Sequence, residues 1–278
     1  MTPGKIEKFI EEGWIIIDIP EPGIIQEQAE ALEKKSREII GTDCSLAKLH
    51  EYVDEESYRN LYAALSEYFW ENEFSLKAGK AFMPVLKELI GLDIMVQYRP
   101  YLRMARPEKT QDNIGYHRDT QYGQTPYELA VHIPFVDLDE NSSLRVISGS
   151  HILPESAFPI IEGVETTVTK GSLDHKMGKP YSPRRMPLPD GMKTEPLSMR
   201  VGQAALFSPA IFHGQELNQG NVTRVTTDVR FVNSNADVEL RLGKVHAGYV
   251  PVTKSPVQQA ADLYYQAQKQ DKAKRKTA

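Results

Sequence analysis

The chain has little cysteine, no long apolar run and no excess of positive charge. Its single cysteine, Cys44, excludes a disulfide within the chain and fits a reducing, cytoplasmic setting. No run of about 18 apolar residues occurs, so no membrane span is expected, and the opening MTPGKIEKFIEEGW lacks the apolar core of a signal peptide. The formal net charge of −5 argues against nucleic acid and anionic membranes as partners, because both are negatively charged.

What the chain does contain is enough apolar material for a core, since 40% of its 278 residues are hydrophobic. Neither a repeat nor a low-complexity linker divides it, so a single domain over 1–278 is expected. The spacing of apolar residues changes near residue 92. Residues 1–92 predict a mostly helical layer with one short strand after Gly13, and residues 93–252 predict a core of strands.

The predicted elements follow from these two periods. Helical spacing and glycine stops predict helices over 6–13, 24–41, 54–70 and 76–91. Alternation of apolar and polar residues predicts strands over 93–104, 129–138, 143–148, 199–208 and 223–233. Residues 253–278 predict a helix and a basic tail. The expected fold class is mainly β with flanking helices, built on a sandwich or barrel such as a jelly roll.

One stretch, 152–195, is rich in proline and glycine and only weakly periodic, which is typical of a lid or a binding loop. Within 166–195, six Lys or Arg residues outnumber three acids, a local balance of +3 in a chain of −5. A basic lid would attract an anionic substrate. The same composition is found in ordinary solvated loops, and the sequence leaves both interpretations open.

The stretch GYHRDT holds His117 and Asp119 two positions apart. On a strand, residues i and i+2 point to the same face, with Cα atoms roughly 6–7 Å apart. An imidazole and a carboxylate together suit a divalent metal such as Fe(II). The pair alone is weak evidence, because two positions recur by chance in surface turns.

A second histidine strengthens the case for a metal site. His213 follows His117 by 96 residues, directly after an apolar strand and a proline-containing turn, and Arg224 lies eleven residues further on. Two histidines and one carboxylate form the facial triad of non-haem iron oxygenases, which leaves the other metal positions open. The planar fork of an arginine suits the carboxylate of a co-substrate.

With these residues in place, the sequence resembles the phytanoyl-CoA dioxygenase-like group of Fe(II)/2-oxoglutarate oxygenases. The resemblance covers about 93–235 and includes NSSLRVISGSH and VGQAALFSPAIFHG, while FIEEGWIII resembles the opening helix and strand of the family. The chain departs from the family pattern at Ser142-Ser143, where a glycine usually follows the asparagine. This departure alters a turn rather than the chemistry.

The resemblance implies a double-stranded β-helix, or jelly-roll, core. It implies iron bound by His117, Asp119 and His213, with 2-oxoglutarate and O₂ as co-substrates, and Arg224 on the remote carboxylate of 2-oxoglutarate. Related halogenases lack the carboxylate ligand so that chloride can bind the iron. The presence of Asp119 therefore favours hydroxylation or another oxygenase outcome.

Further candidates share strand faces with these residues. Thr226, Asp228 and Arg230 lie on the face of Arg224. Thr226 and Arg230 are expected near the co-substrate, and Arg230 is a rival of Arg224 for the 2-oxoglutarate carboxylate. Asp228 is expected to form a structural salt bridge with one of the two arginines.

A second polar face, on the strand expected at 93–104, carries Gln97, Arg99, Tyr101 and Arg103, and it either lines the site or faces solvent. Arg99 is expected to contact the co-substrate. His132 lies in an apolar strand, as a core histidine or as part of the site. The candidate substrate contacts are Tyr116, Gln121, Arg103 and His132.

The expected function is Fe(II)/2-oxoglutarate-dependent hydroxylation of a small molecule, in biosynthesis or secondary metabolism. The basic lid favours a polar or anionic substrate, such as a sugar-like compound or a metabolite linked to CoA or a carrier protein. Two alternatives remain open. The first is a cupin-like metalloenzyme that does not use 2-oxoglutarate, and the second is a non-catalytic jelly-roll binding module.

Overall fold

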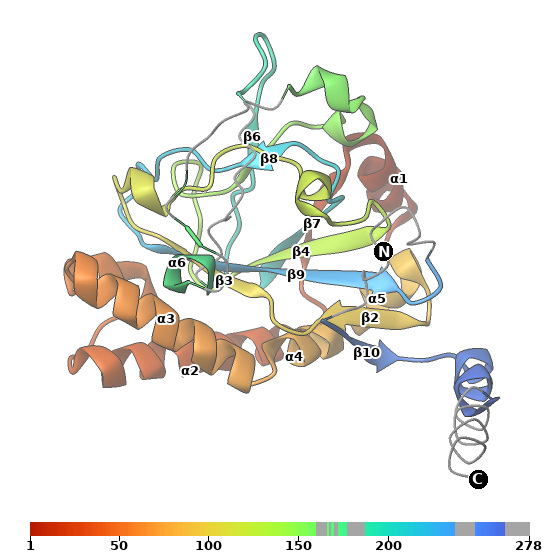
Figure 1. Ribbon diagram of the computed structural model, residues 1–278, viewed down its shortest axis with the longest axis horizontal. Helices are drawn as coiled ribbons and strands as arrows, with labels where there is room; N and C mark the ends of the chain where they lie inside the picture. The colour runs from red at the N-terminus through yellow and green to blue at the C-terminus, as the bar shows by residue number, and fades with distance from the viewer. Residues whose placement is uncertain (160–165, 167, 170–171, 177–186, 237–247, 265–278) are drawn as a thin grey trace.

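The computed structural model describes residues 1–159, 166, 168–169, 172–176, 187–236 and 248–264. Two antiparallel sheets face each other, and helices cover the outer side of the larger sheet (Figure 1). Most of the basic residues expected in the lid, and the basic tail, lie outside the described residues. Among the described helices, none has both the length and the apolar character needed to cross a membrane.

The larger sheet has seven strands. In spatial order they are β1 (Trp14–Asp18), β7 (Gln203–Phe207), β4 (Glu128–Pro134), β9 (Arg224–Asn233), β2 (Ile94–Gln97) and β10 (Tyr249–Thr253), with β3 (Tyr101–Ala105) also paired to β9. The smaller sheet consists of β6 (Glu195–Pro196), β5 (Arg145–Val146) and β8 (His213–Gly214). Because β1 pairs with β7, the N-terminal segment contributes an edge strand to the same sheet that carries β9.

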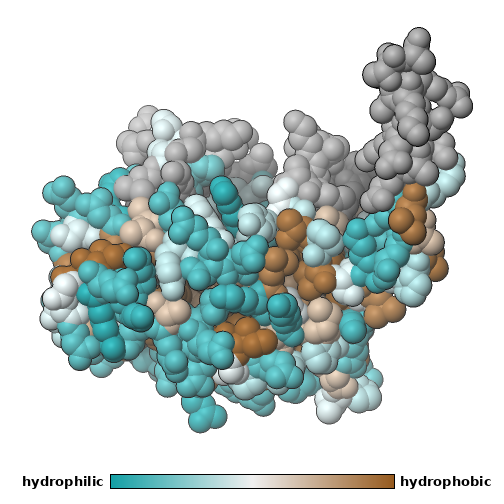
Figure 2. All heavy atoms as spheres, turned by 90° about the horizontal axis from the view of Figure 1, so that it is seen from below, coloured by the Kyte–Doolittle hydropathy of each residue, from teal (hydrophilic) through white to brown (hydrophobic). Residues whose placement is uncertain are grey.

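The helices precede most of the strands along the chain. They are α1 (Pro3–Glu12), α2 (Pro22–Ile40), α3 (Glu55–Glu71), α4 (Phe74–Ala81), α5 (Met83–Ile90), the short α6 (Leu173–Lys176) and a C-terminal helix over 256–264. Short 3₁₀ turns complete the set: η1 (Leu46–Glu51), η2 (Thr110–Asp112), η3 (Asp119–Tyr122), η4 (Ser150–Ile152) and η5 (Glu155–Ala157). The face seen in Figure 2 is largely hydrophilic, with small hydrophobic patches between the polar side chains.

Alternation along β9 separates the two faces of the large sheet. Val225, Val229 and Phe231 are fully buried, and Phe231 lies next to Gly79 of α4 on the helical side. The alternate residues Arg224, Thr226, Asp228 and Arg230 point to the opposite face, which looks toward the small sheet. We call this the inner face. It is unusually polar for a surface that is buried on both sides.

The structure corrects several sequence-based expectations. The chain is a mixture of helices and antiparallel sheets rather than mainly β. The single helix predicted over 76–91 is wrong, because α5 restarts at Met83 with Pro84 in its first turn, a residue that cannot continue a preceding helix. The single strand predicted over 93–104 is also wrong, since β2 ends at Gln97 and β3 begins after Pro100.

The close contact between Gly79 of α4 and the large sheet predicts that a glycine-to-alanine change in this helix is destabilising. An added Cβ at Gly79 would lie 2.9 Å from Val252 Cγ1. Gly79→Ala should therefore lower the free energy of unfolding by about 1–3 kcal/mol, the usual cost of overpacking, although alanine favours helices. Urea denaturation measures the effect. Gly23→Ala, where nothing lies within 4 Å, is the control and should be neutral or stabilising. The added substitution Val252→Ala removes the clashing atoms. If the double variant Gly79→Ala/Val252→Ala shows no gain in the free energy of unfolding over the sum of the two single changes, the explanation is wrong.

Candidate metal centre

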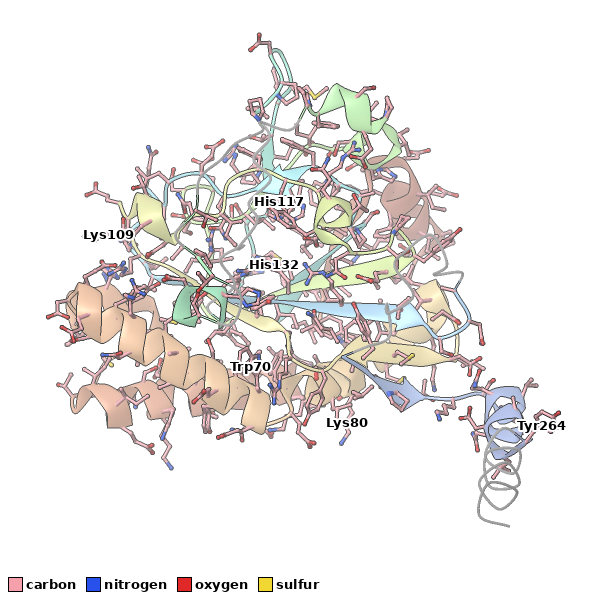
Figure 3. The ribbon with its side chains drawn as sticks, in the orientation of Figure 1. Trp70, Lys80, Lys109, His117, His132 and Tyr264 are labelled. Atoms are coloured by element: carbon pink, nitrogen blue, oxygen red, sulfur yellow. The ribbon has the colours of Figure 1, made fainter. Side chains whose placement is uncertain are left out.

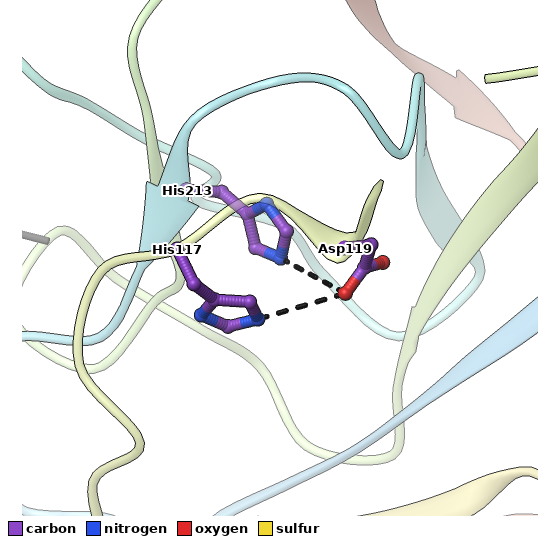
Figure 4. A group of neighbouring side chains, drawn as sticks. All are labelled: His117, Asp119 and His213. Carbon is purple, nitrogen blue, oxygen red and sulfur yellow. Dashed lines mark ion pairs between the residues drawn. The ribbon is translucent and has the colours of Figure 1, made fainter. Parts of the chain in front are cut away.

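Side chains from two distant segments of the sequence meet on the inner side of the large sheet: His117 and Asp119 from one, and His213 from the other (Figure 4). Their ligand atoms all lie within 4.8 Å of one another. Asp119 Oδ1 is 3.5 Å from Nε2 of His117 and 3.9 Å from Nε2 of His213. The structure thus brings together the three residues that the sequence predicts as metal ligands.

The two histidines are aligned by their own backbones. The N–H of His117 donates to the carbonyl of His213 at 2.8 Å, and the N–H of His213 donates back to the carbonyl of His117 at 3.0 Å. Directly opposed residues of an antiparallel pair project to the same side. The imidazole centroids are accordingly 4.5 Å apart.

This pairing depends on a glycine next to His213. A Cβ on Gly214 would lie 2.6 Å from the Cα of Tyr116, so no larger residue fits without moving the strand of His117. Tyr116 itself points away from the triad. Its ring stacks on Phe212 with centroids 5.4 Å apart, and its hydroxyl donates to Glu216 at 2.6 Å.

Asp119 reaches the histidines by a different route from the one the spacing predicts. His117 forms an isolated bridge, whereas Asp119 is the first residue of the 3₁₀ turn η3. The prediction that the two share one strand face is therefore wrong, although their side chains do meet. Arg118 between them points the other way, as expected, and its Nη2 donates to the carbonyls of Ser150 and Leu153.

Hydrogen bonds set the orientation of both imidazoles. Nδ1 of His117 lies 3.0 Å from the carbonyl of Gly115, and Nδ1 of His213 lies 3.0 Å from the carbonyl of Ile211. A carbonyl only accepts, so Nδ1 carries the proton and the unprotonated Nε2 of each ring faces Asp119. This is the tautomer that binds a metal through Nε2.

Two of these three groups, His213 and Asp119, have a lowered pKa. Burial, helped by the charge of His117, lowers the pKa of His213 to about 4, so its ring is neutral at pH 7. Burial alone would raise the pKa of Asp119, but the charge of Arg230, with contributions from both histidines, holds it well below its usual range. Two imidazoles and one carboxylate are a donor set that suits Fe(II).

Arg230, the predicted rival for the co-substrate, lies against Asp119. Its Nη2 donates to Asp119 Oδ2 at 2.8 Å and its Nε to the same oxygen at 3.3 Å. A third donor, Nη1, reaches Gln97 Oε1 at 3.3 Å. Each of the three guanidinium nitrogens therefore donates to a protein group.

Arg224 lies six residues earlier on the same face and is in the opposite situation. It is only 2% exposed, and within the described part of the chain its Nε and Nη2 have no hydrogen-bond partner. Its Nη1 makes one long contact, 3.4 Å, to the carbonyl of Ser142. Thr226 Oγ1 is likewise buried and lacks a partner among the described residues. Burial lowers the pKa of Arg224 to about 10, and the charge of Asp228 offsets only part of this effect.

Asp228 does not form the expected salt bridge with an arginine. Instead its Oδ1 accepts from Nδ1 of His132 at 2.6 Å, across the register that pairs the two residues in β9 and β4. Burial would raise the pKa of Asp228, and the charge of His132 reverses this and keeps it low. His132 lies on the inner face below His117 (Figure 3), and its Nε2 finds no partner in the described ranges.

The remaining predicted contacts divide between the inner face and the surface. Tyr101 pairs with Asp228, and Arg103 pairs with Thr226, so both side chains project to the inner face. Arg99 is exposed, with its guanidinium 5.7 Å from the ring centre of Trp70. Gln121 donates to Glu155 at 2.7 Å, at the start of the expected lid. The structure does not bring Arg99 or Gln121 to the triad.

Two features of the site escaped the sequence analysis. Gly214, which lets the histidine strands approach, carries the weak local signal of a glycine directly after the ligand. The pairing of His132 with Asp228 joins residues 96 positions apart. No local sequence pattern predicts such a pair, because the pairing depends on the register of β4 against β9.

Comparison with known proteins identifies the family. The sequence matches the family Phytanoyl-CoA dioxygenase (PhyH) over residues 6–226, which include the triad and Arg224. The chain belongs to the phytanoyl-CoA dioxygenase family. It is therefore an enzyme of the Fe(II)/2-oxoglutarate oxygenases with a His-x-Asp…His triad, and its cofactors are iron and 2-oxoglutarate. The search of curated proteins finds no match.

Three of the solved structures that match this chain have TM-scores just under 0.5. The carbocyclase SnoK from nogalamycin biosynthesis is 14% identical, with a TM-score of 0.48, over 92% of this chain and 93% of that one. The non-heme monooxygenase ThoJ is 16% identical, with a TM-score of 0.49, over 82% and 77%. EctD from S. alaskensis with bound Fe is 13% identical, with a TM-score of 0.46, over 84% and 76%. The family assignment rests on the sequence match.

The triad predicts a metal affinity that depends on each ligand. His213→Ala should weaken Fe(II) or Co(II) binding by at least about a hundredfold, because one of three protein donors is lost. Anaerobic isothermal titration of the metal-free protein measures this. His151→Ala is the matched control, since the ring of His151 bonds the carbonyl of Ile10 away from the triad. Equal metal affinities of the two variants would show that the triad is not the metal site.

The low pKa of His213 predicts how the stability of the metal-free protein varies with pH. The unfolded chain protonates this residue near its ordinary pKa of 6.5, the folded chain only near a pKa of about 4. The unfolded state binds more protons between these values, so stability falls as pH falls through this window, by about 3 kcal/mol. Urea denaturation of the metal-free protein, in the presence of a chelator and at steps from pH 7 to pH 4, measures the change in the free energy of unfolding. His213→Gln should flatten this dependence, and an unchanged slope would contradict the assignment.

Proposed function

We propose that this protein binds 2-oxoglutarate between the triad and Arg224, and that it hydroxylates a polar or anionic small molecule beside it. We also propose that the two facing sheets form the double-stranded β-helix core of this enzyme class. The observation that carries the proposal is the buried guanidinium of Arg224, which lies on the same face as the metal ligands and has no carboxylate beside it among the described residues.

An unpaired charge inside a protein is costly, and a bound carboxylate would remove that cost. Nε and Nη2 of Arg224 offer the two parallel donors that bind a carboxylate in bidentate fashion. The hydroxyl of Thr226, on the same face, is a further donor for the same anion. Asp228 does not compete, because it is hydrogen-bonded to His132. These groups fit the remote carboxylate of 2-oxoglutarate.

The roles of the chain's own residues follow. His117, Asp119 and His213 hold the iron, which with 2-oxoglutarate and O₂ supplies the oxidising chemistry. Arg224 and Thr226 bind and orient the co-substrate. Asp119, His213 and Arg224 are at most 5% exposed, so the fold shields these groups from bulk water.

The nature of the inner face supports a polar substrate over a free lipid. Tyr101, Arg103 and His132 project from β3 and β4 to the same face as the triad. A hydrocarbon chain placed there would desolvate these groups without offering hydrogen bonds. Nε2 of His132 is buried, and we assign it the role of a contact to a hydroxyl or another polar group of the substrate. Sugar-like compounds and metabolites linked to CoA or a carrier protein fit these requirements.

Anaerobic titration tests the co-substrate site. With Fe(II) bound, adding 2-oxoglutarate should produce a metal-centred absorption band. Arg224→Met should raise the 2-oxoglutarate concentration at half-saturation by about tenfold to a hundredfold, the value of a charge-assisted hydrogen bond of about 1.5–3 kcal/mol. Arg200→Met removes an exposed arginine and should leave this concentration unchanged.

The other outcomes of this titration identify the alternatives. Iron binding without any response to 2-oxoglutarate would favour a cupin-like enzyme of another class. Absence of iron binding would favour a non-catalytic binding module. A normal response of Arg224→Met to 2-oxoglutarate would show that a residue other than Arg224 binds the remote carboxylate. Succinate release and product mass across a panel of sugar-like, thioester and lipid compounds then determine the substrate class.

A further inference from the structure

Arg230 contacts only one of the two carboxylate oxygens of Asp119, and the other oxygen faces the two metal-binding histidines. Both Nε and Nη2 of Arg230 donate to one carboxylate oxygen, Oδ2, at 3.3 and 2.8 Å. The other oxygen, Oδ1, is the atom that faces Nε2 of His117 and of His213. One oxygen is thus directed to the place of the metal, and the other is held by the arginine.

Arg230 is itself fixed from several sides. It lies in the interior of β9, and its cross-strand neighbour on β4 is Ala130, whose small side chain leaves room for the guanidinium. Gln97 of β2 accepts from Nη1 at 3.3 Å. Arg230 is 7% exposed and Asp119 4% exposed, so the pair is shielded from solvent. A guanidinium held in this way cannot follow the carboxylate if the carboxylate rotates.

The contact between Arg230 and Asp119 affects how many coordination positions of the metal stay open. A facial triad of three single donors leaves three positions on an octahedral ion, enough for the two chelating atoms of 2-oxoglutarate and for O₂. If Asp119 bound through both oxygens, one of these positions would be lost. A carboxylate binds in this two-oxygen mode readily when its second oxygen is unoccupied.

We infer that Arg230 is a positioning residue that keeps Asp119 a one-oxygen ligand and so keeps the third metal position open. It acts on the metal only through Asp119. This role differs from binding the 2-oxoglutarate carboxylate, and it holds for any substrate of the enzyme. It requires a metal at the triad but does not require Arg224 to bind the co-substrate.

Two variants separate this role from a simple charge effect. Arg230→Met removes both the donors and the positive charge, and Arg230→Lys keeps the charge without the planar fork. If Arg230 positions Asp119, the visible Co(II) bands should shift in Arg230→Met and, to a smaller extent, in Arg230→Lys. If charge alone matters, Arg230→Lys should keep the bands of the unsubstituted protein. Arg200→Met, at an exposed site, is the control.

The Co(II) spectrum reports the coordination itself. A change of Asp119 from one-oxygen to two-oxygen binding alters the intensity and position of the visible bands, whereas a loss of folding stability at constant coordination does not. We expect altered bands in metal-saturated Arg230→Met. Bands identical to those of the unsubstituted protein would overturn the proposal.

A rescue experiment tests the same role without relying on Arg230 variants that retain Asp119. In Asp119→Ala, Arg230 is left facing the two histidines without its carboxylate. Formate should then restore part of the Co(II) affinity, because Arg230 can hold its second oxygen. In Asp119→Ala/Arg230→Met, formate should have no such effect. Equal rescue in both proteins would overturn the proposal, and binding of Co(II) to the unsubstituted protein shows in the same assay that the metal site exists.

Discussion

The site depends on the pair of backbone hydrogen bonds between His117 and His213, which join segments 96 residues apart at 2.8 and 3.0 Å. A metal tolerates only small errors in the placement of its ligands. Side-chain contacts alone would leave two flexible segments to find that geometry, whereas a two-way backbone pair places both Cβ atoms on one side. The close approach in turn requires Gly214, because Tyr116 occupies the space where a Cβ would lie.

The inner face of β9 shows how one residue type takes two roles. Arg224 and Arg230 are six positions apart on the same face, and both are buried. Each guanidinium nitrogen of Arg230 donates to Asp119 or Gln97, while Nε and Nη2 of Arg224 have no partner among the described residues. The difference lies in the neighbours and not in the arginines. The carboxylate of Asp119 compensates the buried charge of Arg230, and the absence of such a contact at Arg224 is the basis for proposing it as the binding site.

Much of the fold was predictable, because periodicity and turn residues are local signals. The helices near 6–12, 24–40 and 55–70 and the strand over 224–233 agree with the structure within a few residues. Both errors of continuity have a proline at the break, Pro84 within a predicted helix and Pro100 within a predicted strand. These signals were present in the sequence. The 3₁₀ turn at Asp119 had no local signal of comparable strength, and one of its N–H groups, that of Thr120, donates to the distant carbonyl of Pro209.

The sequence by itself determined which chemical groups are available: a His-x-Asp pair, a later histidine and an arginine eleven residues after it. Residue type and spacing carry that information, because ligand chemistry depends on the side chain alone. Only the tertiary structure decided which groups are paired. Asp228 was expected beside an arginine and lies beside His132, and Arg230 was expected near the co-substrate and lies beside Asp119. The physical reason is that the free energy of a buried charge depends on its neighbours, and long-range strand register brings those neighbours together.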